Sequence, residues 1–390
     1  MKVAMLTREY PPEVYGGAGV HVEYLARELA ERIEVEVLCF GADRPGARAF
    51  RPWEAAEKGG PALATISVDV ALAADIGGAD LVHSHTWYAN LGGHLAKLLH
   101  GVPHVLSTHS LEPSRPWKAE QLGAGGYALS SWCERTAIEA ADGVIAVSSA
   151  MRGDVLRYYP AVEPGRIEVI HNGIDPEQYA PDSDTDVLER YGIDPGRPIV
   201  LFVGRITRQK GVTLLLEAAL EFDPSAQLVL CAGAADTDEL LEEVQEGVRR
   251  LHERRDGVFW IERMLEKREV IQLMTHATVF CVPSVYEPMG IVNLEAMACE
   301  TAVVASHVGG IPDVVVDGET GYLVTLDDDF ASEFAERVNT LVRDPELARR
   351  MGEAGRRRVL EHFTWSAVAE RTIEFYERSL RVEQAQLEHA

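Results

Sequence analysis

The feature that most constrains the fold is a repeated alternation of short apolar segments with longer amphipathic segments along nearly the whole chain. Apolar runs of this kind are typical of buried parallel strands, and the amphipathic stretches between them are typical of covering helices. The alternation therefore predicts an α/β protein built on parallel sheets. A chain of 390 residues is long enough for two domains of ordinary size.

The alternation occurs twice, once in each half of the chain. The two halves are separated by a polar, Pro- and Asp-rich segment from Asp175 to Pro198, which is expected to act as a hinge. In the first half, strands are predicted at 2–7, 35–40, 81–83, 104–108, 143–147 and 167–170, with helices at about 19–31, 88–100, 117–140 and 149–158. In the second half, strands are predicted at 198–203, 227–231, 258–261, 278–282, 302–305 and 321–324. Helices are predicted between these strands, one of them at 290–299, and also at 331–342, 345–361 and 365–383. We expect two doubly wound Rossmann-like domains, residues 1–178 and 195–364, facing a central cleft, with a C-terminal helix, 365–390, that crosses back to the first domain.

Composition excludes several classes of function. The chain has 37 Lys and Arg against 62 Asp and Glu, a net charge of −25, so it lacks the basic face expected of proteins that bind nucleic acid or anionic membranes. No apolar run is long enough to span a membrane, and the N-terminus is expected to be a core strand rather than an export signal. Five cysteines without a C-x-x-C pair favour a reducing compartment, so a cytoplasmic protein is predicted.

Two strand-to-helix turns carry the chemistry of the second half. Gly204-Arg205 through Lys210-Gly211 supplies cations, and the segment from Glu287 to Glu295 supplies carboxylates. Cations and the free N–H groups of a helix start bind phosphates, and carboxylates accept from hydroxyls. These turns predict a sugar diphosphate site that includes the helix start Gly290, Ile291 and Val292. The two carboxylates also suggest a hydrolase, but the neighbouring cations favour recognition of hydroxyls.

Motifs in the first half are weaker indicators of function. Gly16, Gly17 and Gly19 follow the first strand, where glycines permit close approach of a ligand. The motif resembles a dinucleotide fingerprint, but Val22 replaces its last glycine and the turn is too long, so a dehydrogenase is a remote alternative. A non-enzymatic sugar-binding protein is another.

Histidines provide a further signal. His109 ends a predicted strand and is expected at the site, whereas His83-Ser-His85 lacks a third ligand, so no metal is predicted.

These segments together resemble the retaining glycosyltransferases of family 4, which have the GT-B fold. The resemblance rests on Gly-Gly-Ala-Gly, Ser-Thr-His109-Ser, His171-Asn-Gly-Ile-Asp, Gly-Arg205-x4-Lys210, Glu287-x7-Glu295 and Gly-Gly-Ile-Pro, in the order of the family. Further segments, His-Ser-His-Thr-Trp-Tyr among them, are similar to the actinobacterial branch that makes glycogen or α-maltose 1-phosphate.

The resemblance implies roles for these residues in an ADP-glucose-dependent α-1,4-glucosyltransferase. Arg205 and Lys210 would neutralise the departing diphosphate, Glu287 would hold glucose hydroxyls and Glu295 the ribose. His109 would lie beside the anomeric carbon, and the Gly16-Gly17 loop would border acceptor and diphosphate. The first domain would then be the acceptor side and the second would bind the nucleotide sugar.

The acceptor is expected to be glucose 1-phosphate. Val14-Tyr15 stands where the long glycogen and starch synthases have a lysine, and Thr86 stands where they have an aspartate, which puts polymer elongation in doubt. Candidate residues for the acceptor are Arg8, Tyr15, Arg115 and Lys118. Elongation of glycogen by the same site is the nearest alternative. The nucleotide base and the oligomeric state, a homodimer included, stay open.

Overall fold

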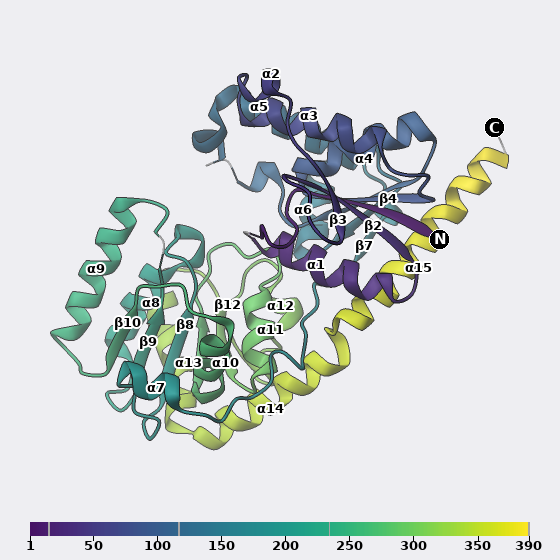
Figure 1. The fold of residues 1–390 in the computed structure, drawn as a ribbon. Helices are drawn as coiled ribbons and strands as arrows, with labels where there is room; N and C mark the ends of the chain where they lie inside the picture. The colour runs from purple at the N-terminus through teal and green to yellow at the C-terminus, as the bar shows by residue number, and fades with distance from the viewer. Residues whose placement is uncertain (15, 116–117, 234, 389–390) are drawn as a thin grey trace. The chain divides into compact units, whose positions relative to one another are not determined.

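The computed structural model describes residues 1–14, 16–115, 118–233 and 235–388. The chain divides into two units: unit 1 comprises Met1–Gly173 with Trp365–Ala390, and unit 2 comprises Ile174–Thr364 (Figure 1). Each unit has its own parallel sheet, as the alternating pattern predicts. Among the described residues, no helix combines the length and the apolar character needed to cross a membrane.

Unit 1 contains, within its described residues, a seven-stranded sheet in the order β3-β2-β1-β4-β5-β6-β7. Every pairing in it is parallel, so the carboxyl ends of its strands lie at one edge. The strands are β1 (Lys2–Thr7), β2 (Glu34–Phe40), β3 (Ala47–Phe50), β4 (Leu81–His85), β5 (His104–Thr108), β6 (Gly143–Ala146) and β7 (Ile167–Val169).

The helices of unit 1 lie between these strands. They are α1 (Gly17–Ala30), α2 (Glu54–Glu57), α3 (Pro61–Ala74), α4 (Trp87–His100), α5 (Lys118–Ala140) and α6 (Ser149–Tyr158), with 3-10 turns η1 (Glu112–Ser114) and η2 (Pro164–Arg166). The C-terminal helix α15 (Trp365–Glu388) packs beside α1 and places Trp365, Phe375 and Tyr376 in the same core as β1 (Figure 1). The C-terminal helix and the first strand therefore contribute to one hydrophobic core.

Unit 2 contains, within the part of it that is described, a six-stranded sheet in the order β10-β9-β8-β11-β12-β13, again all parallel. The strands are β8 (Ile199–Val203), β9 (Gln227–Cys231), β10 (Val258–Ile261), β11 (Val279–Val282), β12 (Ala302–Ser306) and β13 (Gly321–Val324). The helices are α7 (Asp186–Tyr191), α8 (Val212–Ala218), α9 (Asp238–His252), α10 (Lys267–His276), α11 (Ile291–Ala298), α12 (Ile311–Val314), α13 (Phe330–Arg343) and α14 (Pro345–His362), with 3-10 turns η3 (Arg208–Lys210) and η4 (Ala219–Glu221).

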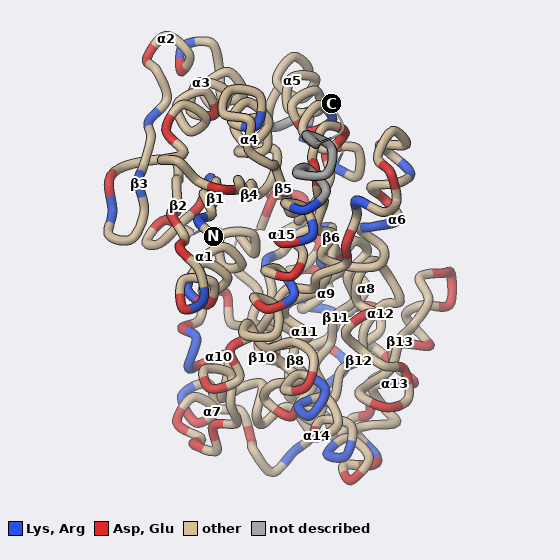
Figure 2. Tube along the Cα trace, turned by 90° about the vertical axis from the view of Figure 1, so that its right-hand side faces the viewer, with Lys and Arg blue, Asp and Glu red and all other residues tan. Residues whose placement is uncertain are grey.

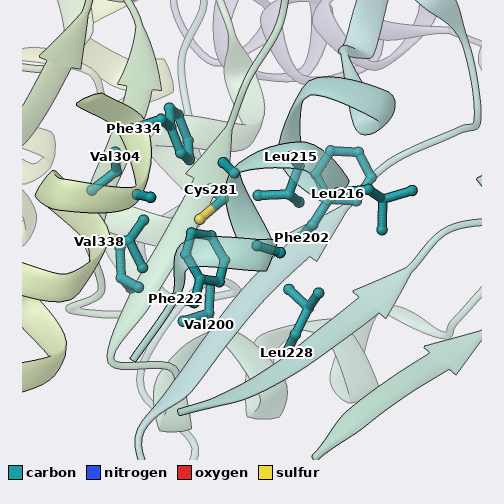
Figure 3. Packing of buried hydrophobic residues seen from close by; sticks show 14 of the residues in the cluster. Val200, Phe202, Leu215, Leu216, Phe222, Leu228, Cys281, Val304, Phe334 and Val338 are labelled. Carbon is teal, nitrogen blue, oxygen red and sulfur yellow. The ribbon is translucent and has the colours of Figure 1, made fainter. Parts of the chain in front are cut away.

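The core of unit 2 explains why its strands are continuously apolar. Val200 and Phe202 on β8 pack with Leu215 on α8 and with Phe334 on α13, all fully or almost fully buried (Figure 3). Helices cover both faces of a parallel sheet, so both faces of each strand are mostly apolar. This rigid support fixes the loops at the carboxyl ends of β8 and β11.

Four elements were not predicted from the sequence. The edge strand β3 is short and half-buried, and α2 has four residues. Helix α3 packs against α4 and α5, and its sequence is apolar on most sides, so it lacks the amphipathic pattern. The segment expected as a hinge contains α7, which packs on α10 within unit 2.

Charged residues are spread over the helices of both units (Figure 2). Arg249 on α9 pairs with Glu246 and Glu253, and Arg349 on α14 pairs with Glu346, within one turn along each helix. Such exposed pairs contribute little to stability individually. Most of the acidity is therefore solvated surface.

Candidate active site

The cationic and acidic turns of unit 2 meet because β8 and β11 are neighbours in the sheet. Lys210 lies in η3 after β8, and Glu287 lies in the loop after β11. The Lys210 Nζ and Glu287 Oε2 atoms are 2.6 Å apart, with side chains 27% and 9% exposed. This is a short, charge-assisted ion pair at the carboxyl edge of the sheet, where open α/β sheets bind ligands.

Glycines hold these turns together. Gly211 has φ +63°, and an added Cβ would lie 1.9 Å from the carbonyl oxygen of Pro283. Gly309 has φ +53°, and its Cβ would lie 1.9 Å from the carbonyl oxygen of Glu287. The next amide, Gly310 N–H, donates to that same oxygen at 2.9 Å. The backbone of Glu287 is therefore clamped by the turn after β12.

The other cations of the turn lie further out. Arg205 is half-exposed and its Nη1 lies 3.6 Å from Asp236 Oδ1. Arg208, on the same turn, pairs with Glu243 on α9 at 2.9 Å. Lys210 is thus the cation of this turn that is directed at the carboxylate after β11.

Helix α11 begins at Gly290, which has φ +87° and provides no side-chain cap. Among the described residues, no acceptor bonds to the N–H groups of Ile291 and Val292. A helix start with open N–H groups favours an anion. The sequence-predicted residues Gly290, Ile291 and Val292 therefore form the start of α11, beside the loop that carries Glu287.

Glu295 is on α11 and has a partner that the sequence did not suggest. Tyr179 Oη donates to Glu295 Oε1 at 2.9 Å. Burial raises the pKa of this carboxyl, and the tyrosine hydrogen bond opposes that rise. The two carboxylates therefore have different environments: Glu287 faces a lysine and Glu295 faces a phenol.

His109 in unit 1 follows β5 and lies within a cluster of imidazoles. Its Nε2 is 3.1 Å from His85 Nδ1, and its ring packs edge-on against His21 at 4.7 Å. His21 Nδ1 is 2.7 Å from Asn172 Oδ1, in the His-Asn-Gly-Ile-Asp segment. Burial lowers the pKa of His109 well below its ordinary value, and the neighbouring His21 and His83 lower it further. His109 is therefore a neutral imidazole at neutral pH.

The same three imidazoles are the residues that could hold a metal. Within the described part of the chain, His21, His85 and His109 form the group whose ligand nitrogens all lie within 4.8 Å of one another. Nε2 of His21 and Nε2 of His85 are buried without a hydrogen-bond partner among the described residues. Neutral imidazoles are good ligands for transition metals. His21 carried no signal as a third candidate ligand because it is distant in the chain from His85 and His109, and the absence of a metal stays a prediction.

The glycine loop of unit 1 is held by an acidic residue. Gly16 is the N-cap of α1, and its N–H donates to Glu9 Oε2 at 2.9 Å. Gly17 is exposed, while Gly19 packs so closely on the Glu9 side chain that a Cβ would clash. Residues 8–16 separate β1 from α1, so the tight turn of a dinucleotide fold is absent from these described elements. Tyr15 lies outside the described residues.

The three cations proposed for the acceptor have different surroundings. Arg115 Nη2 pairs with the fully buried Glu112 at 2.8 Å. Arg8 and Lys118 instead both lie against the ring of Tyr88. Tyr88, like Tyr179, carried no signal in the sequence because its role depends on residues brought together by the fold. The expectation that the edges of both sheets face one cleft stays a prediction.

Comparison with known proteins identifies the family to which this chain belongs. A family profile described as Glycosyltransferase Family 4 matches residues 15–178, and one described as Glycosyl transferases group 1 matches residues 184–358. The α-maltose-1-phosphate synthase of Mycolicibacterium smegmatis is 56% identical over 97% of this chain and 99% of its own length. That of Mycobacterium tuberculosis is 55% identical over the same shares.

Solved structures agree on the fold. The sucrose-phosphate synthase of Thermosynechococcus elongatus superposes with a TM-score of 0.77 at 25% identity, covering 98% of this chain and 99% of its own. The two parallel-sheet units are therefore those of a GT-B enzyme, and neither a dehydrogenase nor a passive sugar-binding protein describes the chain. It belongs to glycosyltransferase family 4, in the branch that contains the mycobacterial relatives.

Proposed function

We propose that the protein transfers glucose from ADP-glucose to glucose 1-phosphate, giving α-maltose 1-phosphate and ADP with an α-1,4 bond. The observation that carries this proposal is the Lys210–Glu287 pair, a cation for diphosphate and an acceptor for sugar hydroxyls at 2.6 Å. The specific acceptor is supported by relatives 55% to 56% identical over nearly their full length that are named α-maltose-1-phosphate synthases. Within α-glucan biosynthesis, the product would feed the formation of glycogen.

In this proposal unit 2 binds the donor. Lys210 and Arg205 neutralise the diphosphate, and the open N–H groups at the start of α11 add positive potential. Glu287 accepts from the glucose hydroxyls and Glu295, held by Tyr179, accepts from the ribose. When the donor binds, its phosphate replaces Glu287 as the partner of Lys210, and its hydroxyls replace Lys210 as the partner of Glu287.

The transfer retains the anomeric configuration by a same-face route. The acceptor hydroxyl attacks the anomeric carbon as the bond to the diphosphate breaks, and a leaving phosphate oxygen takes the acceptor proton. No protein nucleophile is required, so catalysis rests on charge stabilisation and positioning. His109, as a neutral imidazole, hydrogen-bonds the donor sugar beside the anomeric carbon without adding a charge.

A product assay tests the proposal. The enzyme is incubated with ADP-, UDP- or GDP-glucose and with either glucose 1-phosphate or glycogen, and the labelled products are separated. We expect α-maltose 1-phosphate from ADP-glucose with glucose 1-phosphate as the main product. Faster incorporation into glycogen would instead support the glycogen synthase alternative.

We further propose that no metal is needed, because the diphosphate charge is met by Lys210, Arg205 and the start of α11. Activity should be unchanged after treatment with EDTA. Loss of activity that returns when zinc or magnesium is added back would contradict this, and His21→Asn would then show whether the imidazole cluster is the site.

A cytoplasmic location is proposed on the cysteines. All five are buried free thiols, the state expected in a reducing compartment. Cell fractionation tests this, and recovery of the enzyme from an exported fraction would contradict it.

A further inference from the structure

Three side chains of unit 1 come from the ends of three neighbouring strands. Arg8 follows β1, Tyr88 is in the first turn of α4 after β4, and Lys118 begins α5 after β5. The strands are adjacent and parallel in the order β1-β4-β5. All three residues therefore lie at the carboxyl edge of the sheet, the same edge at which His109 follows β5.

Both cations lie against one aromatic ring. The Arg8 Cζ atom is 4.1 Å from the centroid of the Tyr88 ring. The Lys118 Nζ atom is 5.3 Å from that centroid and 3.4 Å from the Tyr88 hydroxyl oxygen. An aromatic face attracts a cation, but two cations on one ring also repel each other. The arrangement therefore has an excess of positive charge at a single point.

No described carboxylate neutralises this pair. Within the described residues, neither Arg8 nor Lys118 has an ion-pair partner, although the chain carries 62 acidic residues against 37 basic ones. Arg115 shows the contrast, because buried Glu112 already takes its guanidinium. Ser130 Oγ donates to the other oxygen of Glu112, which fixes that ion pair in place. Arg115 is thus a structural residue, and the unneutralised charge belongs to Arg8 and Lys118.

The start of α4 adds to the positive potential. Its N-cap, Thr86, has φ +63° and makes no side-chain cap. A β-branched residue in the left-handed region is rare and is found mostly at functional sites. Among the described residues, no acceptor bonds to the N–H groups of Trp87 and Tyr88. The first turn of α4, which carries Tyr88, therefore has two open amides of its own.

We propose that Arg8, Lys118 and Tyr88 form the binding site for the phosphate of a sugar phosphate acceptor. A phosphate monoester carries up to two negative charges and several acceptor oxygens, which suit a guanidinium fork, an ammonium and a phenol O–H. The inference rests on the proposed function, and it replaces Arg115 with Tyr88 among the residues expected to bind the acceptor. The diphosphate of the donor is assigned to unit 2, so this site is available for the second anionic substrate.

The test compares charged and neutral acceptors in Arg8→Gln, Lys118→Gln and the double variant. We expect KM for glucose 1-phosphate to rise at least tenfold in each single variant and about a hundredfold in the double variant. KM for ADP-glucose and transfer to a neutral maltooligosaccharide should change less than twofold. Arg8→Lys, which keeps the charge but not the fork, should fall between the wild type and Arg8→Gln.

Arg27→Gln is the matched control. Arg27 also lies over a tyrosine ring of unit 1, with its Cζ 4.7 Å from the centroid of Tyr24, but it is on α1 and not at the carboxyl edge. This variant should leave KM for glucose 1-phosphate unchanged. A loss of affinity equal to that of Arg8→Gln would mean that general charge, not this site, binds the phosphate.

The outcomes separate this inference from the proposed function. If the wild type uses glucose 1-phosphate and the variants keep its KM, the phosphate site is wrong and the proposed function stands. If the wild type does not use glucose 1-phosphate, the proposed function fails, and calorimetry with glucose 1-phosphate and with inorganic phosphate then decides the site. Binding to the wild type that the double variant lacks would support the site, and equal binding or none would overturn it.

Discussion

At the scale of single residues, the candidate site of unit 2 contains a pair of opposite charges. Lys210 and Glu287 satisfy each other at 2.6 Å, and Glu287 is nearly buried. An unpaired carboxylate in that position would be costly and would repel a diphosphate. The pair therefore keeps both groups charged, and under the proposed function each partner would be released when the donor supplies a replacement.

Replacing Lys210 with Gln should lower kcat/KM by about 10²–10³, or roughly 2–4 kcal/mol of transition-state stabilisation, because one phosphate cation is lost. Steady-state kinetics with ADP-glucose gives the measurement. Arg208→Gln is the control on the same turn, since Arg208 pairs with Glu243 instead. A Lys210→Gln enzyme that retains more than half of the wild-type kcat/KM would refute the role of this lysine.

Buried histidines make unit 1 sensitive to acid. Burial lowers the pKa of His104 to about 3 and that of His21 to about 4. The unfolded chain takes up protons below about pH 6.5 while these folded imidazoles do not, so stability falls as the pH drops from there towards the folded values. Their contribution is fully present at neutral pH.

His104→Gln should therefore make the pH dependence of stability shallower. Between pH 7 and pH 5 we expect the wild type to lose about 2 kcal/mol more unfolding free energy than the variant, measured by urea denaturation of unit 1. Parallel pH curves for the wild type and His104→Gln would contradict the assignment.

At the scale of elements, the sequence predicted strands better than the contacts between loops. Apolar runs gave β5, β9, β10 and β13 with their observed bounds, because strands that are buried on both faces are mostly apolar. Helix α3 escaped prediction because its sequence is apolar on most sides, with Leu63 and Val70 apolar although exposed. The turns after β8 and β11 were predicted as one site, but the glycine contacts that clamp them depend on strand order.

The clamp on Glu287 can be tested with a pair of glycines. Gly309→Ala forces a Cβ to within 1.9 Å of the Glu287 carbonyl oxygen, whereas Gly318 has φ +75° with nothing within 4 Å. Both substitutions add left-handed strain of about 1–3 kcal/mol, but only the first also displaces Glu287. We expect Gly309→Ala to lose at least tenfold in kcat/KM, and Gly318→Ala to keep it. Equal kinetics in the two variants would show that Glu287 does not need this clamp.

The sequence could not predict the hydrogen-bond and ion-pair partners that the fold brings to the site residues. Lys210 and Glu287 belong to motifs, so their types and spacing were informative. Tyr179 approaches Glu295 from a segment 116 positions away, and no local pattern marks it. Arg115 looked equivalent to Lys118 until the fold placed buried Glu112 beside it. A charged residue in the sequence is a candidate for ligand binding. Its neighbours in the fold decide whether its charge is available to a ligand.

At the scale of the whole molecule, the C-terminal helix belongs to the same unit as the N-terminal strand. Helix α15 returns to unit 1, and Tyr376 on it is fully buried with its hydroxyl 2.6 Å from His83 Nδ1. Ser107 on β5 meets the other nitrogen of that ring at 2.8 Å. The last helix is therefore tied to the central strands β4 and β5 by a buried polar chain, as well as by the apolar core.

Tyr376→Phe should destabilise unit 1 by about 1–3 kcal/mol, because it leaves a buried ring nitrogen of His83 without its partner. Denaturation monitored by hydrogen exchange would assign the loss to unit 1, with unit 2 unaffected. Tyr158→Phe, at a partly exposed position on α6, should cost less than 0.5 kcal/mol by the usual behaviour of surface sites. Equal effects of the two substitutions would mean that the buried hydroxyl contributes nothing.

Because α15 belongs to unit 1, the whole of unit 2 is one uninterrupted stretch of polypeptide inserted between Gly173 and Trp365. Its two ends adjoin, since Ile174 N–H donates to the Phe363 carbonyl oxygen at 2.7 Å and Ile174 pairs with Thr364 in a parallel bridge. Residues 174–364 are thus one continuous segment that could be exchanged between homologues without interrupting the sheet of unit 1. If unit 2 binds the donor as proposed, such an exchange should alter nucleotide preference. Donor choice would then evolve by replacing one contiguous gene segment.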